Sequence, residues 1–162
     1  KSIQQEPLAS KKPIENCVIA YSLLPNNIAK QVDRKAPSIE KRINAMEDLA
    51  KKGWQIGLRF DPLIYGKDWK NLYTNLFQDI FKRLSNESIH SVTFGPLRFP
   101  KEMLKNLFKL NPESKLLSGP LTLRGTKMTY KAEIELEMSS FCQSLIKSYA
   151  PKTMSFNCRG DF

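Results

Sequence analysis

Three short apolar segments, each followed by a helical pattern, constrain the fold of this chain more than any other feature. The segments begin at Cys17, Gln55 and Ser91. Short apolar runs of this kind are typical of strands buried in a parallel sheet. Strands that alternate with helices indicate parallel βα units. The sequence therefore predicts an α/β fold in which the carboxyl ends of the strands meet at one edge, where such folds bind ligands.

The helices between these strands are marked by their spacing and their ends. Apolar residues recur at three- and four-residue spacing over residues 68–84, which predicts a helix. We expect Asp68 to cap its N-terminus. Another helix is expected to begin after the N-cap Ser38 and to stop at Gly53. Proline predicts the start of two further helices, over residues 25–32 and 100–110.

The pattern changes after residue 112. Turn residues between β-prone residues predict a hairpin within residues 116–131, and a helix over 133–149 and a strand over 153–158 follow. We therefore predict βα units over residues 1–112 and an extension of the same domain over 113–162. Four residues in or beside the hairpin are basic and none is acidic: Lys115, Arg124, Lys127 and Lys131.

Charge and cysteine content narrow the function classes. The net charge is +10, from 26 basic and 16 acidic residues, which favours nucleic acid as partner before an acidic membrane surface; a merely basic protein is the alternative. No apolar run is long enough for a membrane helix, so no membrane role is expected. Three widely spaced cysteines predict neither a disulfide framework nor a metal site, which favours a reducing, cytoplasmic setting.

Polar residues stand at or just after the predicted strand ends. They are Ser22, Arg59, Asp61 and Arg98. A paired arginine and aspartate at this edge can bind an anion or a small molecule, or can form a structural salt bridge. A serine hydroxyl there can donate to a ligand or satisfy a nearby backbone group. We expect no catalytic residue in this set, because the chain has no nucleophile motif and no phosphate-binding glycine loop.

The hairpin interleaves cations with an aromatic ring in Lys127, Tyr130 and Lys131. Cations can neutralise phosphates, and a ring can stack on an unstacked base. Exposed basic hairpins without a partner are also common, and Tyr130 could instead pack inward against the helix that follows.

Several short segments together resemble the spore photoproduct lyase family, the radical-SAM enzymes that repair a thymine dimer in DNA. The segments are Ser22-Leu23 after a strand, Lys35-Ala36-Pro37-Ser38, Arg42-Ile43-Asn44-Ala45, Gly53-Trp54, Phe60-Asp61-Pro62 and Leu97-Arg98-Phe99. The resemblance implies the C-terminal half of a radical-SAM partial (β/α) barrel, closed by a hairpin, a helix and a strand. It also implies S-adenosylmethionine and a [4Fe–4S] cluster as cofactors, and damaged duplex DNA as partner.

The resemblance also implies binding roles for individual residues. Lys1 and Ser22 match positions that help to hold S-adenosylmethionine, and we add Arg59 and Asp61 from their place at the strand ends. Lys127 to Lys131 matches the pattern of a hairpin that enters the lesion site. The predicted nucleic-acid-binding residues are Arg98, Arg124, Lys127, Tyr130 and Lys131.

One departure from the family pattern limits the expected activity. The Cys-x-x-x-Cys-x-x-Cys motif that binds the cluster is absent from the 162 residues. We therefore expect an N-terminal cluster-binding half as partner, and expect this chain to be inert alone. The alternatives are a non-catalytic basic nucleic-acid-binding module and a radical-SAM enzyme with another substrate.

Overall fold

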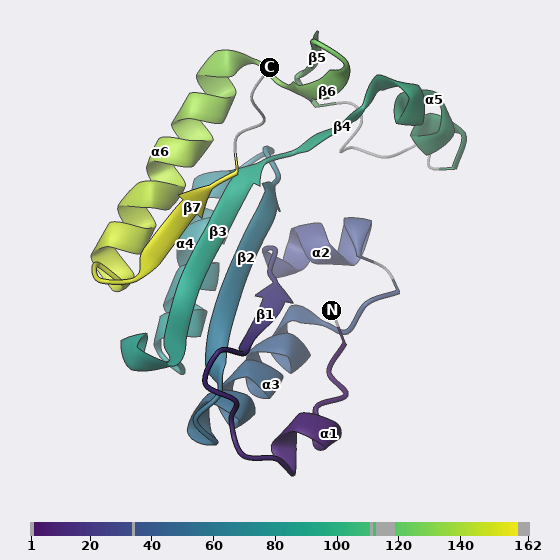
Figure 1. Ribbon diagram of the computed structural model, residues 1–162. Helices are drawn as coiled ribbons and strands as arrows, with labels where there is room; N and C mark the ends of the chain where they lie inside the picture. The colour runs from purple at the N-terminus through teal and green to yellow at the C-terminus, as the bar shows by residue number, and fades with distance from the viewer. Residues whose placement is uncertain (1, 34, 111, 113–118, 159–162) are drawn as a thin grey trace.

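A parallel sheet with helices packed on one of its faces forms the body of the protein (Figure 1). The computed structural model describes all residues except 1, 34, 111, 113–118 and 159–162. The strands lie in the order β1 (Val18–Ser22), β2 (Gln55–Leu63), β3 (Ile89–Pro96) and β7 (Met154–Asn157), and every neighbouring pair is parallel. The predicted α/β class and the parallel βα units are confirmed.

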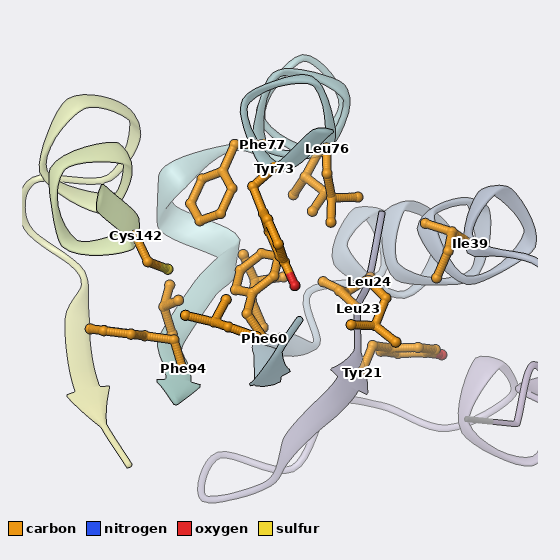
Figure 2. Packing of buried hydrophobic residues seen from close by; sticks show 14 of the residues in the cluster. Tyr21, Leu23, Leu24, Ile39, Phe60, Tyr73, Leu76, Phe77, Phe94 and Cys142 are labelled. Atoms are coloured by element: carbon orange, nitrogen blue, oxygen red, sulfur yellow. The ribbon is translucent and has the colours of Figure 1, made fainter. Parts of the chain in front are cut away.

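Helices join these strands and cover one face of the sheet. Figure 2 shows α3 (Ile39–Lys51), α4 (Trp69–Phe81) and α6 (Ala132–Tyr149) side by side above the strands. The shorter helical segments are α1 (Glu6–Ala9), α2 (Asn26–Val32), η1 (Asn86–Ser88) and α5 (Lys101–Leu110). No helix within the described part of the chain is long and apolar enough to cross a membrane.

The two faces of the sheet differ because side chains alternate along a strand. Ile56, Leu58 and Phe60 of β2 and Phe94 of β3 are fully buried, and Figure 2 shows Phe60 and Phe94 among the core residues beneath the helices. The intervening residues of all four strands form the opposite face, which we call the open face. It consists of Ala20, Ser22, Gly57, Arg59, Ser91, Thr93, Met154 and Phe156.

A second, antiparallel sheet stands beyond the carboxyl end of β3 (Figure 1). Its order is β4 (Arg98–Pro100), β6 (Lys127–Tyr130) and β5 (Leu121–Arg124). The hairpin of β5 and β6 was predicted, whereas the pairing of β6 with β4 was not. The proposed domain boundary at residue 112 lies beside residues outside the described part and stays a prediction.

Several element ends differ from expectation. Ser38 does cap α3, since its hydroxyl accepts from the Lys41 amide at 3.3 Å, and Gly53 ends it with a φ of 89°. Asp68 stands at the N-cap of α4 without a capping hydrogen bond from its side chain, so its expected role was wrong. Pro25 is the N-cap of α2 rather than its first residue. Strand β2 continues past Pro62 because the pairing register shifts there, which spares the strand the missing amide of proline.

Candidate ligand-binding face and basic hairpin

Arg59 lies flat on the open face. Its Nη1 donates to the Ser91 hydroxyl at 3.2 Å and to the Leu58 carbonyl at 3.3 Å. A Cβ added at Gly57 would stand 3.0 Å from Nη2 of Arg59, so the missing side chain of Gly57 is what makes room for the guanidinium. Ser22 and Thr93 pair in register with Arg59 from the two neighbouring strands. The sheet thus presents one cation between two hydroxyl groups.

Asp61 pairs with Arg98, not with Arg59. The two side chains form a double contact, Nη1 to Oδ1 at 3.1 Å and Nη2 to Oδ2 at 3.0 Å. Arg98 also donates to the Pro96 carbonyl at 3.1 Å. This pair joins the end of β2 to the start of β4, which is the structural alternative left open by the sequence. The predicted roles of Asp61 in cofactor binding and of Arg98 in nucleic-acid binding stay predictions.

Arg42 positions the end of β1, and sequence reasoning missed it. Its side chain is 1% exposed, and it donates to the Ser22 carbonyl at 2.8 Å, to the Pro37 carbonyl at 2.9 Å and to Asp33 Oδ2 at 2.9 Å. A signal was available, because Arg42 falls within the apolar stripe of its helix, three residues after Ile39. A charge in such a stripe predicts a buried ion pair.

Two buried tyrosines fix the loop after β2. The hydroxyl of Tyr73 accepts from the Ile64 amide at 2.9 Å, and that of Tyr130 accepts from the Tyr65 amide at 3.0 Å. Burial raises the pKa of Tyr130 to about 12 and raises that of Tyr73 as well. Because Tyr130 is 0% exposed, its ring offers no free face to a base. Tyr130 therefore packs inward, as in the alternative, and both its hydroxyl and its ring contact Tyr65 in the loop after β2. The role of Tyr130 in nucleic-acid binding stays a prediction that its burial does not favour.

The other hairpin residues differ in their surroundings. Arg124 Nη1 lies 2.5 Å from Oε2 of Glu135, a buried carboxylate of α6. Oε1 of Glu135 lies 2.5 Å from the hydroxyl of Thr129, so the hairpin is anchored on α6. Lys127 is half-buried, and Lys131 is exposed. Arg124 therefore has a structural ion pair, while Lys131 presents its charge to solvent.

Helix α5 carries a row of lysines that sequence reasoning missed. Lys101, Lys105 and Lys109 stand four residues apart, are exposed, and form no ion pair with the described residues. Four-residue spacing places them on one side of the helix. The amide of Lys101 donates to the Thr126 carbonyl at 3.1 Å, which joins the lysine row to the hairpin turn. The spacing alone could have identified this row.

The cofactors implied by the family fit this chain unequally. Cys17, Cys142 and Cys158 are all unbonded, and burial raises the pKa of Cys142 to about 12, which opposes the thiolate that iron needs. No group of three or more metal-ligating side chains occurs among the described residues. The [4Fe–4S] cluster therefore does not fit the described residues, whereas the polar row on the open face suits a polar ligand such as S-adenosylmethionine. Lys1, the remaining predicted cofactor residue, lies outside the described residues.

Solved structures share this fold. A spore photoproduct lyase complexed with dinucleoside spore photoproduct matches with a TM-score of 0.82 and 17% identity, over 97% of this chain and 49% of that chain. A spore photoproduct lyase mutant with bound AdoMet and dinucleoside spore photoproduct matches with a TM-score of 0.82 and 15% identity, over 96% of this chain and 48% of that chain. The fold is therefore the α/β fold of the spore photoproduct lyases, which are radical-SAM proteins.

Sequence comparison identifies the family. The profile described as spore photoproduct lyase matches residues 5–154. Spore photoproduct lyase of Bacillus subtilis (strain 168) is 26% identical over 98 residues, which are 59% of this chain and 29% of that protein. This chain belongs to the spore photoproduct lyase family. It spans about half the length of the solved chains and less than a third of the Bacillus subtilis protein.

Proposed function

We propose that this chain belongs to a DNA repair lyase, where it forms one wall of the cavity for cofactor and lesion and contacts the DNA backbone. The observation that carries this proposal is the open face. Parallel sheets normally bury both faces, yet here small and polar residues line one of them, and Met154 and Phe156 are 54% and 52% exposed there. Such a face is suited to a bound ligand and to further protein.

Each part of the site has a separate task in this proposal. Ser22 and Arg59 contact S-adenosylmethionine or the lesion, and the Asp61–Arg98 pair holds the adjoining strand end. When bound to a cluster-containing partner half, S-adenosylmethionine supplies the radical that reverses the thymine dimer. We assign no catalytic residue and no chemical step to this chain, because its sequence lacks the cluster motif.

A second candidate function is a non-catalytic nucleic-acid-binding module. The missing cluster motif and the net charge of +10 favour it. A duplex that contains a spore photoproduct distinguishes the two candidates. A repair protein should bind this duplex more tightly than the undamaged sequence, whereas a general basic module should bind both equally. Fluorescence anisotropy with the two labelled duplexes measures the difference.

Binding of duplex DNA should weaken steeply as salt increases. Lysines that contact phosphates release condensed counterions, and each contact contributes about 0.9 to the slope of log affinity against log salt concentration. Anisotropy titrations from low to moderate salt give this slope. A flat response, or no binding at low salt, would contradict every nucleic-acid role for this chain.

The lysine row of α5 should account for part of that slope. Replacing Lys101, Lys105 and Lys109 together with glutamine should make the slope shallower by up to about 3, with similar losses on every DNA sequence. The matched control replaces Lys82, Lys147 and Lys152 with glutamine. These exposed lysines lie near the α4 end and the α6–β7 turn, away from α5 (Figure 1). Equal slopes for both triple variants would remove α5 from the interface.

A further inference from the structure

Arg59 differs from every other arginine that the structure describes. Four arginines pair with carboxylates, namely Arg42 with Asp33, Arg83 with Glu40 and Glu47, Arg98 with Asp61, and Arg124 with Glu135. Arg59 has no carboxylate partner among the described residues, and its hydrogen bonds go to one hydroxyl and one carbonyl oxygen. Its positive charge is therefore the uncompensated one of this set.

The contacts of Arg59 fix the position of its guanidinium and leave two of its nitrogen atoms available to a ligand. Both of its hydrogen bonds use Nη1, so Nη2 and Nε make no hydrogen bond within the described part of the chain. The guanidinium lies over Gly57, where no side chain could fit without displacing it, and Ser91 holds it from β3. A planar guanidinium fixed in this way can offer two parallel N–H groups to an oxyanion.

Two hydroxyl groups extend the site across the sheet. Ser22 of β1 and Thr93 of β3 are the register partners of Arg59, and register partners in a parallel sheet point to the same face. Both residues are half-buried, and neither side chain forms a hydrogen bond to the described residues. Further along the row Phe156 is exposed, so the row ends beside an apolar surface.

We propose that Ser22, Arg59 and Thr93 form a receptor for an oxyanion, a carboxylate or a phosphate, on the ligand that occupies the open face. The inference rests on the proposed function, which brings one oxyanion of each kind to this face. S-adenosylmethionine carries a carboxylate, and a lesion dinucleotide carries a phosphodiester. In this assignment Asp61 and Arg98 do not bind the oxyanion, because they neutralise each other.

Ligand pairs that differ in a single anionic group test the receptor on the unaltered protein. One pair is S-adenosylmethionine and its decarboxylated analogue. The other is a thymidine dinucleotide and its uncharged methylphosphonate analogue. If the receptor binds the anionic group of one of these ligands, that ligand should bind about tenfold to a hundredfold more tightly than its analogue without the group. This is the factor expected for hydrogen bonds to a charged group. Two-dimensional NMR titration should show the amides of Ser22, Arg59 and Thr93 shifting first.

Variants then assign the effect to Arg59. Arg59→Gln should weaken binding of the anionic member by the same factor and abolish the preference within the pair, while Arg59→Lys should retain part of it. Lys41→Gln removes the same charge from an exposed site on α3 and should leave the preference unchanged. NMR spectra of each variant report its folding, and the comparison within wild type needs no variant.

The outcomes are distinct from those of the DNA experiments. A preference within the first pair identifies the carboxylate as the ligand group, and a preference within the second identifies the phosphate. Equal binding within both pairs, or no measurable binding of any of the four compounds by the wild-type protein, would overturn the receptor. Loss of DNA binding would overturn the proposed function, whereas DNA binding with no preference in either pair would overturn the receptor alone.

Discussion

Replacing Tyr130 with alanine should destabilise the protein by about 3–5 kcal/mol and leave its preference between damaged and intact DNA unchanged. The ring is 0% exposed and lies 6.0 Å from the ring of Tyr65, centroid to centroid. Its removal creates a cavity and leaves the Tyr65 amide without its acceptor. In a domain of this size such a loss lowers the melting temperature by about 10 °C or more. Circular dichroism melts and anisotropy on the same variant measure both quantities.

Tyr130→Phe separates the two contributions of this residue. It retains the ring and removes the hydroxyl that accepts from the Tyr65 amide, so it should cost about 1–3 kcal/mol. Lys131→Ala is the neighbouring control, because Lys131 is exposed and its loss should change stability little while weakening DNA binding. If Tyr130→Ala melts near wild type but loses its preference for damaged DNA, the ring stacks on a base instead.

The residues around Tyr130 in the sequence explain why it was predicted to bind nucleic acid, with inward packing as the alternative. Its neighbours Lys127 and Lys131 are basic, which is typical of an exposed hairpin. The strand that carries it, β6, pairs on both sides, with β5 and with β4. The pairing of β6 with β4 joins segments far apart in the sequence, and no local sequence pattern predicts such a pairing. By contrast, the three strands that alternate with helices, and the long helices themselves, follow from the spacing of apolar residues, and these predictions were confirmed.

The candidate site shows the same division between local and distant signals. Ser22, Arg59 and Asp61 were identified because each stands at the end of an apolar segment. The contacts between them were not predicted: Arg98, which belonged to the same set, reaches Asp61 from β4, and Arg42 reaches the Ser22 carbonyl from α3. The sequence left open whether Arg59 or Arg98 pairs with Asp61. In the structure Arg98, which begins β4, is the arginine that pairs with Asp61.

Arg42→Met should destabilise the protein by about 3–5 kcal/mol, because it removes one partner of a buried ion pair and takes the guanidinium away from Asp33. Asp33 is largely buried, and the carbonyls of Ser22 and Pro37 lose their donor at the same time. Urea unfolding measures the free energy. Lys41→Met, one residue earlier and exposed on the same helix, is the matched control and should stay close to wild type.

Two further variants show that the effect comes from this network. Arg42→Lys keeps the charge, but an ammonium cannot reproduce the planar fork that reaches Asp33, Pro37 and Ser22 together, so it should recover little of the stability. Asp33→Asn in the Arg42→Met background removes the buried carboxylate that has lost the Arg42 guanidinium, and should recover part of the stability. If Arg42→Met unfolds within about 1 kcal/mol of Lys41→Met, the network does not hold the strand end. Because Arg42 binds the Ser22 carbonyl, its loss should also shift the Ser22 amide in NMR spectra, and this links the buried ion pair to the geometry of the open face.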